Sequence, residues 1–337
     1  MDELYYTPKH IRAIYDVKHD NKTIAYHESN KHIPPSAKQS VGALKNVSCW
    51  TAQQLPDIGR FYGKLKRQLK QTIIVVYMGK GGVLKTTLSY NIARTLALNG
   101  IDVLIIGLDT QVSMTTLALK PEQYFDLKNF KECEGLDDFV RKGASLEKII
   151  KPTDLPTLDI LPETSNLNTL ETTLKLQSPR ETFFINKLIT HDCLKKYNVI
   201  LFDCAPGFDV LTENALFASE HLIVPMSTEI GTAQASVQNI KKIQEFQARM
   251  NKKFQSISIV PTLVTNTKLS RQLFSMYESK FGNLVTSNSI RRAITAQESL
   301  IKKKSSIEYD QLCDLSQDFK KVIEELWNER IAAKVVQ

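Results

Sequence analysis

The chain has 337 residues, a length that favours about two domains. Hydrophobic residues make up 42% and charged residues 24%, values that exclude a collagen-like, coiled-coil or wholly disordered chain. The net charge is +8, and residues 1–71 carry +6 of it, with 12 Lys+Arg against 6 Asp+Glu, which leaves +2 for residues 72–337. A small basic N-terminal unit indicates an anionic partner, nucleic acid first, although a merely solvated surface carries charge in the same way.

Apolar runs stay well short of the roughly 18 residues of a membrane span, and the first residues lack a signal-peptide core. The five cysteines are scattered and form no CxxC pair. We therefore expect reduced thiols in a cytoplasmic protein, and neither a disulfide framework nor a zinc site.

Residues 1–71 predict a small all-α unit of short helices with polar turns. Thr7 and Pro8 are typical of a helix start, and a second short helix is expected near residues 22–27. An extended loop and a further helix from about Trp50 follow. The basic run at residues 63–70 is expected to be a helix or linker that joins this unit to the rest of the chain.

From residue 72 onward, apolar strands alternate with helices. Continuous apolar runs are typical of strands that are buried on both faces. Strand–helix alternation predicts an α/β fold: a doubly wound, mostly parallel sheet with helices on both faces, in one domain over residues 72–337. The expected strands lie at residues 73–77, 103–108, 158–161, 199–202, 222–225 and 257–264.

The strongest motif lies between the first of these strands and a helix expected from Lys85 to Leu98. Glycines let backbone N–H groups turn inward, and the N-terminus of the helix adds partial positive charge, so the loop suits a phosphate. Lys85 would reach the β- and γ-phosphates, and the Thr86 hydroxyl would coordinate Mg²⁺. A glycine-rich turn without a ligand is the simpler alternative. The nucleotide-binding residues that the motif predicts are Gly79, Lys80, Gly81, Gly82, Val83, Leu84, Lys85, Thr86 and Thr87.

One position departs from the general phosphate-loop pattern. That pattern has glycine directly before the lysine, and this chain has Leu84 there. A side chain at this point must fit close to the phosphates, so we expect backbone strain at Leu84.

The segment KGGVLKTT resembles the deviant Walker A box of the ParA/MinD family of ATPases. In that family the first lysine reaches across a nucleotide-sandwich dimer to the partner's phosphates. The resemblance therefore implies ATP and ADP as ligands with Mg²⁺, a homodimer that forms on ATP, Lys80 acting in trans and Lys85 in cis.

Two later segments extend the resemblance. Residues 107–111 are similar to the DxDPQ switch of the family, which implies that Asp109 orients or deprotonates the attacking water. Gly107 and Thr110 depart from that pattern, and a weak hydrolysis rate is expected as a result. Residues 199–207 resemble the Walker B segment, which gives Asp203 the magnesium shell together with Thr86. The adenine is expected near the loop that contains Asn266.

The resemblance covers about residues 72–325 and favours the ParA branch, which partitions plasmids and chromosomes. Residues 318–337 look like a packing helix rather than the membrane helix of MinD, so no membrane partner is expected. The branch implies a cytoplasmic, nucleoid-associated ATPase that binds DNA without sequence preference. A ParB-like partner would stimulate its hydrolysis. Basic residues at the matching C-terminal positions are the candidates for this DNA surface, although a solvated run is the alternative: Lys268, Arg271, Arg291, Arg292, Lys302, Lys303 and Lys304.

The N-terminal unit resembles a MerR-like winged helix-turn-helix, which the large ParA proteins carry to bind operator DNA and repress their own operon. A dimerisation cap with incidental charge is the alternative. The candidates for DNA contact in this unit are Lys22, His27, Lys31, Lys38 and Lys45.

Two other functions compete with partition. A nucleotide-regulated transcriptional repressor with negligible turnover would explain Leu84, Gly107 and Thr110. A MinD-like ATPase that positions a membrane or protein cargo is the other alternative.

Overall fold

The central sheet has seven strands in the order β11-β10-β3-β9-β4-β8-β7. The computed structural model describes residues 5–18, 20–41, 44–67, 70–129 and 131–332. Six neighbouring strands of this sheet run parallel, and only the edge strand β7 pairs antiparallel, with β8. The strands are β3 (Thr72–Val76), β4 (Val103–Leu108), β7 (Lys151–Pro152), β8 (Leu158–Leu161), β9 (Val199–Cys204), β10 (His221–Ser227) and β11 (Ser256–Thr262).

Both faces of the sheet are buried because successive residues of each strand enter different apolar clusters. Ile74 and Val76 pack in one cluster, and Ile73 and Val75 pack in the other. Continuous apolar strands are expected where helices cover both faces of a parallel sheet. The doubly wound α/β fold predicted from the sequence is confirmed.

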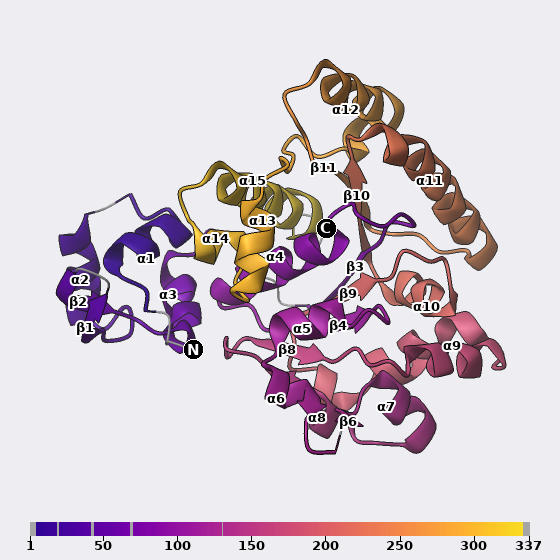
Figure 1. Ribbon diagram of the computed structural model, residues 1–337, viewed down its shortest axis with the longest axis horizontal. Helices are drawn as coiled ribbons and strands as arrows, with labels where there is room; N and C mark the ends of the chain where they lie inside the picture. The colour runs from indigo at the N-terminus through magenta and orange to yellow at the C-terminus, as the bar shows by residue number, and fades with distance from the viewer. Residues whose placement is uncertain (1–4, 19, 42–43, 68–69, 130, 333–337) are drawn as a thin grey trace.

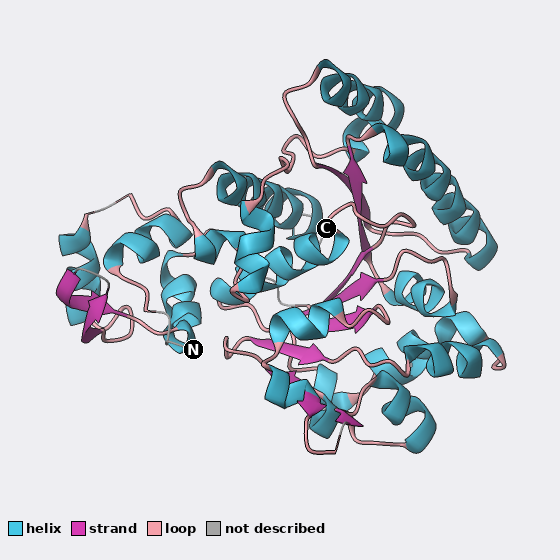
Figure 2. Cartoon of the chain, in the orientation of Figure 1, coloured by secondary structure: helices cyan, strands magenta, loops and turns pink. Residues whose placement is uncertain are grey.

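Helices cover the two faces unequally (Figure 1, Figure 2). The first face is covered by α4 (Lys85–Leu98), α15 (Asp314–Glu325) and the π-helical segment η6 (Leu326–Ile331) that follows it. The second is covered by α7 (Leu136–Lys142), α9 (Leu167–Lys175), α10 (Val210–Ala218), α11 (Ile230–Met250) and α12 (Lys268–Phe281). The shorter elements are α5 (Ser113–Ala118), α6 (Pro121–Tyr124), β5 (Phe125–Asp126), β6 (Lys131–Glu132), α8 (Leu146–Ile149), α13 (Thr295–Ile301) and α14 (Ser306–Tyr309).

The expected C-terminal packing helix is confirmed over the described residues. Val322, Leu326 and Ile331 are buried in the first cluster. Within the described part of the chain, no helix has both the length and the apolar character that a membrane crossing needs.

The N-terminal unit differs from the expected all-α arrangement in one respect. Its helices are α1 (Pro8–Tyr15), α2 (Asn21–Ser29) and α3 (Leu55–Tyr62), and between α2 and α3 lies an antiparallel hairpin of β1 (Ala37–Val41) and β2 (Leu44–Cys49). The hairpin replaces the extended loop that the sequence predicted. The strands are short and mostly polar, so their pattern gave little strand signal.

The basic run after α3 is a linker and not a helix over its described residues. α3 ends at Tyr62, and residues 63–67 have no helical assignment. Leu65 is buried, and the Lys66 carbonyl accepts a hydrogen bond of 2.7 Å from Trp327 Nε1. The linker is therefore fixed against the C-terminal helical segment.

The N-terminal unit packs closely against the sheet-containing body. Its apolar side chains share the first cluster with α4 and α15. The Tyr15 hydroxyl donates to the carbonyl groups of Leu55 (2.7 Å) and Leu98 (3.0 Å), which joins α1, α3 and the end of α4. In Figure 1, α2 and the hairpin lie at the end of the unit far from the sheet. A domain boundary near residue 71 stays a prediction.

A buried ion network lies where the N-terminal unit meets the body. Arg94 of α4 is fully buried and donates to both carboxylate oxygens of Glu308, at 2.6 and 2.7 Å. It also donates to Asp154 at 2.7 Å. Tyr6 of the N-terminal unit donates its hydroxyl proton to Glu308 at 3.2 Å. Burial opposes ionisation of Glu308, but Arg94 and then Lys304 hold its pKa below the ordinary value.

We predict that Arg94→Met destabilises the protein by about 3–5 kcal/mol, because it leaves the buried Glu308 carboxylate without its main partner. Chemical denaturation at neutral pH measures the loss. The matched control is Arg60→Met, which breaks an exposed pair with Asp57 and is expected to cost less than about 1 kcal/mol. Equal losses in the two variants would contradict the structural role of the buried network.

Candidate nucleotide-binding site

The residues of the candidate site, which are predicted ones and Glu163, gather at the carboxyl ends of four neighbouring strands. The phosphate loop follows β3, Asp203 lies in β9, Asp109 follows β4, and Glu163 follows β8. These strands are adjacent in the order β3-β9-β4-β8. Carboxyl ends of parallel strands form one edge, where open α/β sheets bind their ligands.

The phosphate loop places a lysine in a buried position beside two carboxylates. Lys85 begins α4, and its ammonium group donates to the Lys80 carbonyl at 2.9 Å. Burial lowers the pKa of Lys85, while the charges of Asp203 and Asp109 act in the opposite direction. The loop is tied to the sheet because Thr262 at the end of β11 donates to the Val83 carbonyl at 3.1 Å.

The glycines of the loop have different functions. A Cβ atom at Gly79 would lie 2.5 Å from Asn239 Oδ1, so α11 leaves no room for a side chain there. Gly81 and Gly82 face open space, and Gly82 has a left-handed backbone with φ +75°. The loop is thus packed at its base and open at its tip.

Leu84 confirms the expected strain. It has a left-handed backbone with φ 67° and ψ 27° directly before α4. Residues with a Cβ atom rarely adopt this conformation, which costs roughly 1–2 kcal/mol relative to the right-handed region. Packing of its half-buried side chain against the first apolar cluster offsets part of this cost.

Asp203 has the properties of a buried ligand group. Its side chain is fully buried, Oδ1 accepts a 2.7 Å hydrogen bond from Ser89 of α4, and Oδ2 has no hydrogen-bond partner among the described residues. Burial raises the pKa of Asp203 to about 6, although Ser89, Thr86 and Lys85 lower it. A buried carboxylate oxygen without a partner is unfavourable unless a cation or donor reaches it.

Asp109 lies at the start of the loop between β4 and α5, and it is half-buried. Its carboxylate accepts the Gln111 backbone N–H at 3.0 Å. The loop continues through Val112, which has φ 56°, into α5. Thr110 and Gln111 lie in this turn, so the expected switch segment is a tight loop at the edge of the site.

Sequence reasoning missed Glu163. This residue is buried, and its carboxylate accepts the backbone N–H groups of Asp109 (3.2 Å) and Met114 (2.9 Å). Burial first, and then the charge of Asp203, raises the pKa of Glu163 to about 8. The available signal was an acidic residue two positions after the strand expected at residues 158–161.

Asn266 is exposed in the loop after β11, at the same edge as the phosphate loop. Its role near the adenine stays a prediction.

The basic residues near the C-terminus are less available for DNA than the sequence suggested. Arg291 is bound by Asp318 at 2.6 Å, and Arg292 pairs with Glu229. Lys303 donates to the Leu119 carbonyl, and Lys304 pairs with Asp154 and with Glu308 of the buried network. The remaining candidates, Lys268, Arg271 and Lys302, are exposed.

The N-terminal candidates for DNA contact fall into two groups, exposed lysines and a histidine that packs against other side chains. Lys22, Lys31 and Lys38 are exposed, and Lys38 donates to Ser48 across the hairpin at 2.8 Å. His27 instead lies against Phe61 and Tyr62, and its Nδ1 is 2.6 Å from the Tyr62 hydroxyl. His27 is thus a packing residue and a poor candidate for DNA contact. The side chain of Lys45 lies outside the described residues.

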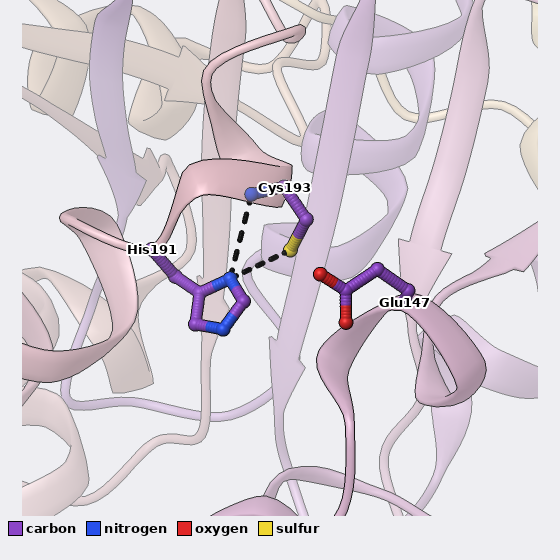
Figure 3. Close-up of side chains that lie close together, drawn as sticks. All are labelled: Glu147, His191 and Cys193. Carbon is purple, nitrogen blue, oxygen red and sulfur yellow. Dashed lines mark hydrogen bonds between the residues drawn. The ribbon is translucent and has the colours of Figure 1, made fainter.

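One further cluster of side chains joins α8 to the segment before β9 (Figure 3). Glu147, His191 and Cys193 each bring a ligand atom within 4.8 Å of the others. His191 Nδ1 lies 3.1 Å from the Cys193 sulfur and accepts the Cys193 backbone N–H at 3.4 Å, so its lone pair serves as a helix cap. Burial and then Glu147 raise the pKa of Cys193 to about 11, so this thiol keeps its proton at neutral pH.

We predict that Leu84→Gly is more stable than Leu84→Ala by about 1 kcal/mol, because both variants lose the leucine packing but only alanine retains the left-handed strain. Thermal or chemical denaturation measures the difference. Ala25→Gly in the exposed face of α2 is the control, where glycine is expected to be less stable by about 0.5–1 kcal/mol. A Leu84→Ala variant as stable as Leu84→Gly would show that residue 84 is not strained.

A family model and a curated relative match this arrangement. The AAA domain family model matches residues 71–256, more than half of the chain. The chromosome partitioning protein ParA of Caulobacter vibrioides is 26% identical over 255 residues, which cover 75% of this chain and 93% of that protein.

Solved structures share the fold. A Borrelia burgdorferi B31 structure described as a plasmid partition protein bound to AMPPNP has a TM-score of 0.65 and 22% identity, over 78% of this chain and 100% of that one. Cobyrinic acid a,c-diamide synthase of Mycobacterium smegmatis, with an ATP analogue and magnesium, has a TM-score of 0.60 and 24% identity, over 77% and 96%. Since these two have different functions, structural likeness alone gives the fold. Together with the family match, the phosphate loop and the carboxylates beside it place the chain in the ParA-type family of partition ATPases.

Proposed function

We propose that this chain is a DNA partition ATPase that binds ATP with Mg²⁺, dimerises and is stimulated by a ParB-like partner. The observation that carries the proposal is the position of Lys85 and two carboxylates around a loop whose tip faces open space. A triphosphate there would meet the ammonium group of Lys85 and the N-terminus of α4.

The residues present fit a magnesium ion. The unpartnered Oδ2 of Asp203 is buried in the site, and Thr86 is the second residue of α4. These two oxygens are hard donors of the kind that Mg²⁺ prefers. When bound, the ion would neutralise charge on the phosphates, and Asp109 would orient the attacking water.

An ATP-dependent dimer is supported by the surface around the loop. Lys80 is exposed, as a lysine that acts on a second copy must be. Ile230, which begins α11 after β10, is 68% exposed, and Ile294 is 77% exposed. The Arg292–Glu229 ion pair joins the segments that carry the two isoleucines. Exposed apolar side chains that follow strands at the same edge of the sheet as the nucleotide loop suit a face that a second copy covers.

We predict that Lys85→Ala abolishes ATP binding, because it removes the buried cation of the loop. Lys80→Ala is expected to bind ATP within about threefold of the wild type but to form no ATP-dependent dimer. Calorimetry measures binding, and light scattering measures dimerisation. Unchanged affinity in Lys85→Ala would refute the site, and a normal dimer of Lys80→Ala would refute its trans role.

Hydrolysis separates partition from the alternative, a repressor with negligible turnover. Turnover that DNA and the cognate partner stimulate, and that Asp109→Ala blocks, supports the ATPase. No turnover under those conditions supports the repressor.

We also propose that residues 1–71 form a winged helix-turn-helix unit that binds the operator of its own operon. Support comes from the two successive helices α1 and α2 at the start of the unit, which is the order of a helix-turn-helix, and from the exposed Lys22 on α2. The exposed Lys268 and Arg271 at the start of α12 would serve non-specific nucleoid DNA.

We predict that Lys22→Ala weakens binding to a promoter fragment of the operon and lowers the slope of log affinity against log salt by about 1, because one phosphate contact is lost. Fluorescence anisotropy over a salt series measures both. The control is Lys128→Ala, an exposed lysine between β5 and β6. An identical effect of the two substitutions would remove the specific role of α2.

A further inference from the structure

A carboxylate from outside the phosphate-loop and switch motifs lies inside the nucleotide site. Glu163 follows β8, is 1% exposed and stands beside Asp203 and Asp109, whose charges both disfavour its ionisation. Placing a third carboxyl group in a buried site that already has two is costly. The presence of the Glu163 carboxyl group in this site must therefore be explained by the groups that it binds.

Glu163 fills the space where residue 107 would have a side chain. A Cβ atom on Gly107 would lie 2.4 Å from Cγ, Cδ and Oε1 of Glu163. Gly107 lies inside β4, where its backbone is extended, so its conformation does not require glycine. Glycine is required at position 107 because Glu163 occupies the space that a side chain there would need.

The register shows where this space lies. Gly107 of β4 pairs with Asp203 of β9. Paired residues of adjacent strands point to the same face of a sheet, so a side chain at position 107 would stand beside the Asp203 carboxylate. The carboxyl group of Glu163, which follows β8, thus occupies the space beside Asp203 that Gly107 of β4 leaves empty.

The Glu163 carboxyl group binds both ends of residues 109–115, which are called the switch segment from here on. Oε1 accepts the Asp109 N–H at 3.2 Å, and Oε2 accepts the N–H groups of Met114 at 2.9 Å and Thr115 at 3.2 Å. In return, the Thr115 hydroxyl accepts the Glu163 N–H at 2.7 Å. The turn that contains Asp109 is therefore fixed between β4 and α5 by one side chain.

We propose that Glu163 is a positioning residue for Asp109. The proposal includes that positions 107 and 163 are exchangeable: either one can supply the carboxyl group, provided that the residue at the other position is small enough to leave space for it. This inference rests on the proposed function of Asp109 in hydrolysis. The geometric part of it concerns the nucleotide-free protein and is tested separately.

The test is a double-mutant cycle with Glu163→Ala, Gly107→Asp and the double variant. Hydrogen exchange of the amides of residues 109–115 in the nucleotide-free protein reports the position of the switch. Partner-stimulated kcat and ATP affinity report its consequence. Glu163→Gln is a fourth variant that keeps the size of the side chain, in case Glu163→Ala does not fold.

We expect Glu163→Ala to speed exchange at residues 109–115 by about tenfold or more, because three hydrogen bonds to the carboxyl group are lost. kcat should fall by a similar factor while ATP affinity changes by less than about threefold. Gly107→Asp alone should also be impaired, because it displaces Glu163. The double variant should recover most of both losses, because the carboxylate then comes from β4. Glu163→Gln should lie between Glu163→Ala and the wild type, because the amide nitrogen cannot accept.

The matched control is Asp138→Ala. Asp138 is also buried and accepts a backbone N–H, that of Gly135 at 2.9 Å, but it caps α7. This variant should lose stability and leave exchange at residues 109–115 unchanged. Unchanged exchange in Glu163→Ala and Glu163→Gln, or a double variant no better than the worse single one, would overturn the proposal. Faster exchange in a chain that never hydrolyses ATP would instead sustain the positioning role and refute the proposed ATPase.

Discussion

The site depends on the in-register parallel pairing of β3, β9, β4 and β8. Because these strands end together, a loop, two aspartates and a glutamate from distant parts of the sequence meet on one edge. The helices that bury both faces of the sheet make this register costly to shift, since a slip of one residue would move every side chain to the opposite face, into a cluster that is packed around other side chains. The precision of the site is therefore a consequence of the apolar core beneath it.

The helix α4 connects this edge with the N-terminal unit. Its first residue, Lys85, lies in the phosphate loop, and Ser89 one turn later holds Asp203. Farther along the same helix, Arg94 organises the buried ion network that includes Tyr6. The N-terminal unit and the nucleotide loop are thus attached to one continuous helix, of which every residue except Thr86 is buried, so the two parts share a core as well as a chain.

The sequence predicted most of the fold and the centre of the site, because the apolar runs and the glycine-rich motif are local signals. The expected helix from Lys85 to Leu98 and the strand at residues 103–108 agree with the structure residue by residue. The hairpin of the N-terminal unit escaped prediction because its strands are short and polar. Intramolecular partners of Arg291, Lys303 and Lys304 could not be foreseen, since they lie far away in sequence. Glu163 was missed for the same reason, because its importance depends on the empty position at Gly107.

The pairing of Gly107 with Glu163 restricts the order in which this site can change during evolution. A side chain introduced first at position 107 meets an occupied space, and loss of the glutamate first leaves the switch segment without its anchor. A lineage that moves between the two arrangements must therefore pass through an impaired intermediate or change both positions together. The two positions are 56 residues apart in sequence, but in the fold they share one space.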